Sequence, residues 1–593
     1  MHDASWGIEA GYESAGGEWR DADPATLAAI RAALGADGPG PLSARAVLDG
    51  DWIITLEDGA ELDGHGPLPA DLPLGYHRVL DDAGERLHVV APPSCPVPAG
   101  RGWGWAVQLY GLRSARSWGI GDLGDLRALG EWSRAAGASM ALVSPLHAPA
   151  PGLPQQPSPY YPGSRCSRNL LHLCVEDVPG AADAGVDLAD LAAAGRALLG
   201  DRRIDRDAVY RLKRDALERI WARSWRRPAG ADRRGGIPGW ATYAAIAEVV
   251  GDADHRRWPA GLRRPDGADV ARLLTEPAIA ELVAFHAWIQ WLLDEQVAAA
   301  SEALPIMNDV AIGVDPGGAD AWLWQDVFAS GMRVGAPPDE FNTAGQDWGL
   351  PPFDPWRLRA ADYEPFVQTV RAALRGARGL RVDHVMGLFR LWWIPESADP
   401  ARGAYVRYPA ADLLDILSLE AHRHGAAWVV GEDLGTVEDA VRDELSRRGV
   451  LSYRLLWFED APPAAWPEGA LAAVTTHDLP TVAGLWSGAE PDAGPMRERL
   501  QRHAGLADGA TVSEAVDGAH GALAAAPCAL VTATLDDVMG VPDRPNHPGT
   551  TDEFPNWSLA LPVLLEEVLD DPRTAATAAA LGSRPNGGAP PLG

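Results

Sequence analysis

The chain has 593 residues, and 47% of them are hydrophobic, which is enough for a large buried core and excludes wholesale disorder. Its net charge of −31 argues against binding the polyanionic backbone of nucleic acid or an anionic membrane surface, so we expect neither partner. The first residues lack the basic and apolar regions of a signal peptide, and no uncharged apolar stretch is long enough to cross a membrane. Four scattered cysteines without CxxC spacing indicate a reducing compartment, so we expect a cytoplasmic protein.

Residues 1–97 are predicted to form a small β-rich module. Residues 47–59 and 76–93 contain runs typical of strands, and DDAG supplies a turn inside the second run. The Pro- and Gly-rich stretch 91–102 then predicts a linker into a second domain.

From Trp103 onward, apolar strands alternate with helical stretches. Residues 105–112 and 139–148 each indicate a buried strand. Residues 121–138 between them have helical periodicity, and Asp122 is a plausible N-cap. This order of strand, helix and strand predicts parallel strands.

Residues 176–303 interrupt the alternation. The long amphipathic runs 208–225 and 279–304 have helical periodicity and no strand between them. We therefore predict a helical insertion of about 176–303.

The alternation then resumes with six further apolar segments. They lie at 305–315, 379–384, 427–435, 450–458, 471–479 and 529–538. Together with the first two, they give eight strands separated by helices, which predicts an α/β fold of the (β/α)8 TIM-barrel type over residues 98–575, with helical insertions. Residues 576–593 are predicted to be a disordered tail.

An acidic residue follows each of three predicted strands. Asp383 follows GLRV, Glu432 follows WVVG, and Asp478 follows AVTTH. In a TIM barrel the C-terminal ends of the strands carry the chemistry, so we expect these three carboxyl groups to lie close together.

Converging carboxyl groups must separate in pKa, so that one stays ionised while another keeps its proton. This is the division of labour that retaining glycoside chemistry requires. Arg381 lies two residues before Asp383 and on the same side of its strand, where its charge would keep Asp383 ionised. His384 and His477 are candidates to hydrogen-bond sugar hydroxyls.

Two other interpretations stay open at this point. A single acid after a strand is usually a helix cap or a solvated loop residue. Carboxylates with two histidines could also bind a divalent ion, although no HxH or HExxH spacing supports a metal site.

Several motifs resemble a known family. DVAIGVD, GLRVDHVMGL, VVGEDLGTV and TTHDL resemble the four ordered sequence blocks of the α-amylase superfamily. Further motifs at 158–169, 335–352 and 546–557 (SPYYPGSRCSRN, GAPPDEFNTAGQDWGLPP and NHPGT followed by PNW) resemble the 4-alpha-glucanotransferases of glycoside hydrolase family 77. The likeness runs from about residue 103 to 560, but SRCSRNLLHL departs from the SAFAGNPLYI pattern common in the family.

The resemblance implies a role for each matching residue. Asp383 matches the catalytic nucleophile, Glu432 the general acid/base, and Asp478 the residue that stabilises the transition state. The remaining residues match positions that contact the substrate or cover its cleft, and they are Tyr160, Asp315, Gln346, Trp348, Arg381, His384 and His477.

The implied reaction is transfer of α-1,4-glucan segments between maltodextrins by a retaining double displacement, with glucans as partners and with no cofactor and no metal. Two alternatives remain: an α-glucan hydrolase of the same superfamily, and a glucan-binding protein without catalysis. The sequence leaves the oligomeric state open.

Overall fold

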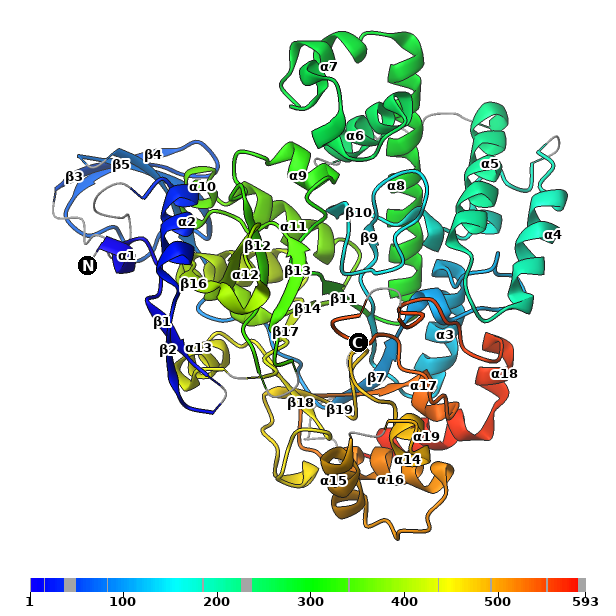
Figure 1. Cartoon of the computed structure of the whole chain (residues 1–593). Helices are drawn as coiled ribbons and strands as arrows, with labels where there is room; N and C mark the ends of the chain where they lie inside the picture. The colour runs from blue at the N-terminus through cyan, green and yellow to red at the C-terminus, as the bar shows by residue number, and fades with distance from the viewer. Residues whose placement is uncertain are drawn as a thin grey trace.

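A computed structural model describes residues 2–14, 16–36, 50–82, 84–183, 186–224, 237–339, 342–435, 437–490, 493–550 and 553–584. Figure 1 shows a central ring of strands, with helices α4 and α5 on one side of the molecule and the sheet containing β3 and β5 on the opposite side.

The centre of the molecule is an eight-stranded parallel sheet that closes on itself. Its strands are β7 (Gly102–Val107), β8 (Met140–Val143), β11 (Ile306–Val310), β14 (Gly379–Val382), β17 (Trp428–Gly431), β18 (Ser452–Leu455), β19 (Ala470–Ala473) and β20 (Leu530–Thr534). Neighbours follow chain order, the last strand pairs with the first, and a parallel bridge between Val430 and Leu451 joins β17 to β18. Each of the eight predicted segments overlaps one strand of this barrel, so the prediction of a TIM barrel is confirmed.

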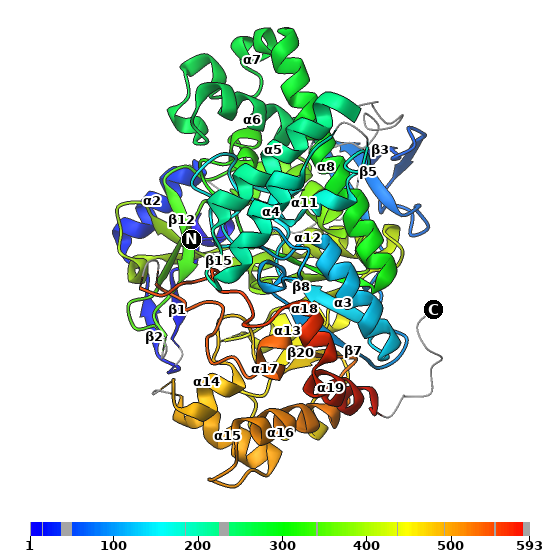
Figure 2. The same cartoon turned by 90° about the vertical axis from the view of Figure 1, so that its right-hand side faces the viewer.

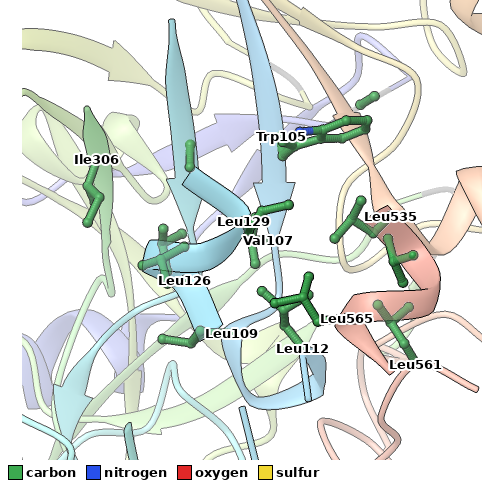
Figure 3. Packing of buried hydrophobic residues seen from close by; sticks show 14 of the residues in the cluster. Trp105, Val107, Leu109, Leu112, Leu126, Leu129, Ile306, Leu535, Leu561 and Leu565 are labelled. Atoms are coloured by element: carbon green, nitrogen blue, oxygen red, sulfur yellow. The ribbon is translucent and has the colours of Figure 1, made fainter. Parts of the chain in front are cut away.

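The first barrel helix illustrates how local sequence fixes an element. Helix α3 (Leu123–Ala135) begins after Asp122, whose carboxylate accepts from the amides of Gly124 and Asp125 in a capping box. The predicted N-cap is therefore confirmed. Leu126 and Leu129 are buried in the main core cluster, which also contains Val107 and Ile306 (Figure 3).

The helices around the barrel come from short crossovers and one long insertion. Between β10 (Ser164–Arg168) and β11, the chain forms α4 (Ala189–Ala197), α5 (Arg206–Ser224), α6 (Ile237–Val250), α7 (Ala268–Leu273) and α8 (Pro277–Ala303). Helix α8 packs against both α3 and α6, and Figure 2 shows α4, α5 and α8 over one face of the barrel.

The helices between β11 and the end of the barrel domain are α9 (Ala319–Leu323), α10 (Pro355–Ala360), α11 (Glu364–Leu374), α12 (Ala410–Arg423), α13 (Asp439–Arg447), α14 (Val482–Ser487), α15 (Gly494–Ala504), α16 (Val512–Ala524), α17 (Leu535–Val538) and α18 (Leu565–Asp570).

A second sheet beside the barrel was not predicted from the sequence. It is antiparallel, in the order β13 (Gln346–Leu350), β12 (Met332–Ala336), β15 (Arg390–Pro395) and β16 (Ala404–Arg407). Its strands come from the connections on either side of β14, the strand that directly precedes Asp383.

The N-terminal segment forms two separate packing units. Residues 2–36, with α1 (His2–Ser5), β1 (Gly11–Glu13), β2 (Trp19–Asp21) and α2 (Pro24–Leu34), pack against the second sheet, where Ile8 bridges to Val406. The strands β3 (Asp51–Thr55), β4 (Glu61–His65), β5 (Gly75–Asp81) and β6 (Gly84–Val90) form their own antiparallel sheet in the order β4-β3-β5-β6. The expected β-rich character is confirmed, and the boundary at residue 97 stays a prediction.

The prediction of a disordered tail from residue 576 is wrong for its first part. Helix α19 (Pro572–Gly582) continues through this region, with Asp571 as its cap and Pro572 at its first turn. The alanine-rich run favours a helix, and Ala578 and Leu581 are buried in the main core cluster. Residues 585–593 lie outside the described residues.

The helices within the described ranges were also compared with the length and hydropathy of a membrane span. None of them is both long enough and apolar enough to cross a bilayer.

A lysine is buried where helix α5 meets the barrel. Lys213 is the single lysine among 51 basic residues, and its side chain is fully buried. Its Nζ donates to the carbonyls of Leu171 and Leu173, both at 2.7 Å, and lies 3.6 Å from the Asp122 carboxylate. A compact ammonium group thus joins the helical insertion to the capped end of α3.

We expect both replacements of Lys213 to destabilise the protein. Lys213→Arg forces a longer, planar group into a filled space, at a cost of about 1–3 kcal/mol, and Lys213→Met leaves the Asp122 charge buried without its cation, at about 3–5 kcal/mol. Chemical denaturation followed by tryptophan fluorescence measures both. Arg211→Met on the exposed side of α5 is the control, and a Lys213→Arg protein as stable as the parent would contradict this account.

Candidate active site

A buried guanidinium group organises the C-terminal end of β14. Arg381 donates to both carboxylate oxygens of Asp309, at 2.7 and 2.8 Å, and to Oδ1 of Asp383 at 3.0 Å. The parallel register of β11 and β14 sets Asp309 beside Arg381. Burial by itself would lower the pKa of Arg381, but the charge of Asp309 raises it well above its usual value, so the group is a permanent cation.

Asp309 is a site residue that the sequence analysis missed. It lies inside β11 rather than after it, and its exposed fraction is 4%. A charged residue within an apolar strand that is expected to be buried needs a partner, and this was the signal in IMNDV that could have identified it.

Glu432 stands one residue past β17, the strand that pairs with β14. Its Oε2 accepts from the amide of His384 at 3.0 Å, and its Oε1 accepts from the amide of Leu434 at 2.9 Å. His384 has φ 45°, a left-handed conformation that is strained for a residue with a side chain. The strained turn after Asp383 thus aims an amide at Glu432 and brings the two acids together.

The electrostatic setting of Asp383 and Glu432 favours protonation of one member of the pair. Burial raises the pKa of Asp383, and the charges of Asp309 and Glu432 raise it further, while Arg381 opposes both effects. Burial also raises the pKa of Glu432, against the charge of Arg381 and the two amide hydrogen bonds. One proton shared by such a pair leaves one carboxylate and one carboxylic acid.

Asp478 follows β19 and has a different environment. Asn546 donates to its Oδ1 at 2.7 Å, and Nε2 of His477 lies 3.4 Å from its Oδ2. Burial raises the pKa of Asp478, but His477 and Asn546 lower it overall, so this acid stays ionised. Burial by itself would lower the pKa of His477, but the charge and hydrogen bond of Asp478 raise it, so the net shift is upward.

Tyr160 connects the two halves of the site. Its hydroxyl donates to Oδ2 of Asp309 at 2.6 Å and lies 3.3 Å from Nδ1 of His477. Its ring lies 4.7 Å from the His477 ring and 5.3 Å from Trp557. Contacts therefore run without a break from Asp383 through Arg381, Asp309, Tyr160 and His477 to Asp478.

The segment that contains Gln346 and Trp348 reaches the site through the second sheet. Trp348 packs edge-on against the His384 ring at 5.2 Å and donates from Nε1 to Oε1 of Gln346 at 3.2 Å. A Cβ at Gly335 would lie 1.9 Å from the Gln346 carbonyl oxygen, so a glycine is needed for strand β12 to pair with β13 here. Burial lowers the pKa of His384 to about 4, which leaves its ring neutral beside Trp348.

Asp315 is the one predicted residue for which the structure gives no link to this network. Its Oδ1 accepts from the Gly317 amide at 2.8 Å, and its main-chain amide donates to the carbonyl of Pro162. It lies among the charges of Asp254 and Arg256 in the loop before α9. A role for Asp315 in substrate binding stays a prediction.

An open pocket lies at the carboxyl end of the barrel, beside this network. It encloses about 560 Å³, and its lining includes Gln108, Asp309, Arg381, Tyr453 and His477. Asn546, Trp557 and Tyr453 carried no assignment from the sequence, although the first two belong to the NHPGT and PNW motifs. In the part of the chain that the structure describes, no group of three or more His, Cys, Asp or Glu side chains is arranged to hold a metal ion.

A closed (β/α)8 barrel with acids past three strand ends and an arginine between two carboxylates has the constellation of enzymes that cleave glycosidic bonds. Residues 107–565 match the sequence model of glycoside hydrolase family 77, described as 4-alpha-glucanotransferase. The chain belongs to this family, so the resemblance seen in the sequence is confirmed.

Known proteins agree with this assignment. The 4-alpha-glucanotransferase of Mycobacterium tuberculosis is 43% identical over 613 aligned residues, which cover 90% of this chain and 82% of that protein. The solved structure of amylomaltase from Corynebacterium glutamicum superposes with a TM-score of 0.84 at 30% identity and covers 98% of both chains. Amylomaltase from Streptococcus agalactiae in complex with acarbose has a TM-score of 0.67 over 81% of this chain and 98% of its own; at 18% identity it supports the fold alone.

We expect Asp478→Asn to lower the pKa of His477, because burial then acts on the imidazole without the opposing carboxylate. A raised histidine pKa stabilises the fold below the unfolded value of about 6.5, and this contribution is lost as pH rises through the folded pKa. The variant should therefore lose stability at pH 6 but little at pH 8, by less than about 1 kcal/mol because Asp478 is partly exposed. Histidine-selective NMR titration measures the pKa, and melting curves measure the stability. Asp517→Asn, on the outside of α16, is the control. An unchanged His477 titration would exclude the ion pair.

Proposed function

We propose that this protein is a 4-alpha-glucanotransferase that moves α-1,4-glucan segments between maltodextrins. The observation that carries the proposal is the pairing of Asp383 and Glu432, one residue past adjacent strands, with a cation on one acid and two amides on the other. Membership of the family supports the same activity.

In the first step, a carboxylate oxygen of Asp383 attacks the anomeric carbon of the donor. The bond to the departing glucan breaks as Glu432 gives its proton to the leaving oxygen. The two amides that hold Glu432 fix its oxygens, and Arg381 keeps negative charge on Asp383. The product of this step is a β-linked glucosyl-enzyme.

In the second step, Glu432 takes the proton from the 4-hydroxyl of an acceptor glucan. The acceptor oxygen attacks the anomeric carbon and displaces Asp383, so two inversions give net retention. Asp478, ionised beside His477, is suited to hold hydroxyls of the donor sugar. Tyr160 and Trp557 offer aromatic faces next to it.

Transfer rather than hydrolysis requires that a bound acceptor compete with water. A well-placed acceptor has a high effective molarity, and a covered cleft reduces the access of water. The contact between Trp348 and His384 supports a role for the Gln346 to Trp348 segment in such a cover. We propose that the reaction takes place in the cytoplasm, which suits four free thiols.

The alternatives give different products from maltotriose. A 4-alpha-glucanotransferase converts it into glucose and a ladder of longer maltodextrins. A hydrolase gives glucose and maltose without longer products, and a glucan-binding protein leaves maltotriose unchanged. Separation of the products by chromatography or mass spectrometry decides among the three.

The acids are tested in the same assay. Glu432→Gln should lower kcat by roughly 10²–10⁴ through loss of proton transfer, and Asp383→Asn should lower it by at least about 10⁴ through loss of the nucleophile. Asp517→Asn and Glu498→Gln make the same chemical changes at exposed positions on α16 and α15 and should keep full activity. An Asp383→Asn protein with undiminished transfer would overturn the mechanism.

Asp309→Asn should shift the pH profile in a defined direction. The charge of Asp309 raises the pKa of Asp383, and its removal also frees Arg381 to pair with Asp383 alone, so the pKa of Asp383 falls. The reaction needs ionised Asp383, which exists above that pKa, so the acidic limb of kcat/KM moves to lower pH. A loss of about 10²-fold in kcat from a misplaced Arg381 should accompany the shift. An acidic limb that moved to higher pH would contradict the role given to Asp309.

A further inference from the structure

A second cavity, mainly apolar, lies behind the nucleophile on the outer side of the barrel. It encloses about 840 Å³, counting space open toward solvent, between strands β11 and β14 and helices α11 and α12. Its walls are mostly aromatic and aliphatic, and they include Ile312, Phe328, Phe353, Phe366, Leu388 and Leu417. This lining is unsuited to a glucan, whose hydroxyl groups would lose their hydrogen bonds to water without replacement.

The wall of this cavity includes one cationic side chain, and Asp383 and His384 of the active site also line it. Arg165, on β10, has an exposed fraction of 8%. Its Nη1 donates to the carbonyls of Ala311 and Ile312, at 3.2 and 2.9 Å, and its guanidinium carbon lies 5.5 Å from the centre of the Phe353 ring. These contacts fix the guanidinium plane against the apolar wall.

Within the described part of the chain, the guanidinium of Arg165 forms no ion pair: burial lowers its pKa, and the charge of Asp320, which lies beyond ion-pair distance, offsets this only in part. Its Nε is buried without a hydrogen-bond partner, and among the described residues no carboxylate oxygen lies within the 4.0 Å of an ion pair. Asp320, on α9, accepts from the main-chain amide of Arg165 at 2.8 Å, not from its side chain. A buried charge that internal anions balance only in part is unfavourable, so an anion in contact with this guanidinium would be stabilised.

The position also departs from the family sequence pattern. Arg165 stands in SRCSRN where the common pattern is SAFAGN, so an alanine is usual at this place. An arginine in place of alanine adds a charge to the cavity wall.

We propose that this cavity binds a small amphipathic monocarboxylate, an acid with an aromatic or unbranched alkyl body. The carboxylate pairs with the unsatisfied edge of Arg165, where an arginine presents parallel N–H groups to two oxygens. The body lies among the phenylalanine and leucine side chains and removes apolar surface from water. The proposal is independent of the glucan-transfer activity, since its tests measure binding only.

The test compares two molecules of the same shape on the full-length protein. Calorimetry with 3-phenylpropionate should give saturable binding to one site per chain, and uncharged 3-phenylpropan-1-ol should bind at least roughly tenfold more weakly, because it loses a charge-assisted hydrogen bond. Equal affinities of the acid and the alcohol, or no binding of either, would overturn the proposal.

Variants locate the site. Arg165→Gln should reduce the affinity for the acid to that of the alcohol and leave the alcohol unchanged, and Val370→Phe, which fills the cavity from α11, should weaken both. Arg584→Gln removes another buried guanidinium with an unpartnered Nε, far along the chain near Gly102, and should leave both affinities intact. Acid binding that survives in the Arg165→Gln variant would overturn the proposal. If that variant does not fold, the comparison of the acid with the alcohol on the unmodified protein decides.

Discussion

The site depends on one buried cation, the guanidinium of Arg381. It is 3% exposed, and it holds Asp309 and Asp383 on neighbouring strands of the barrel. Without it, the carboxyl groups at the ends of β11, β14 and β17 would repel one another in a poorly hydrated space, and protonation would relieve the repulsion. Arg381 lets a carboxylate persist beside a second acid, and that asymmetry is the chemical requirement for attack by one group and proton donation by the other.

The barrel supplies the geometry because its strand order follows the chain order. Asp383 and Glu432 follow paired strands, and the amide of His384, directly after Asp383, binds Glu432. Asp478 follows β19, and its carboxylate has different partners, including Asn546. Tyr160, from the loop before β10, bridges Asp309 and His477 and so spans the distance between these strands. Residues as far as 317 positions apart therefore hold one another in place through side-chain contacts, not through local structure.

What the sequence predicted well has a local physical signature. The eight barrel strands are apolar runs with helices between them, and the three acids follow such runs directly. Asp122 was identifiable as a cap because an acid precedes a periodic helix. The second sheet was missed because its strands interrupt apolar residues with arginines, glycine and proline, and their pairing depends on segments far apart in the chain. Asp309 was missed for a related reason, because its role depends on the ion pair with Arg381, which lies on the neighbouring strand.

Arg381 and Arg165 make an instructive contrast within one molecule. Both are buried and both contact an aromatic ring. Arg381 lies on the nucleophile strand β14, and Arg165 lines the cavity beside that strand. The charge of Arg381 is balanced by two carboxylates from its own chain, whereas the contacts of the Arg165 side chain are two carbonyl groups and a phenylalanine ring. Burial disfavours the charged form in both cases. Internal anions outweigh this effect for Arg381, whereas for Arg165 the charge of Asp320 offsets it only in part. One buried charge is thus fully balanced within the fold, and a second, at the wall of a mainly apolar cavity, is balanced only in part. That difference is expected of a site that takes a further counter-ion from outside.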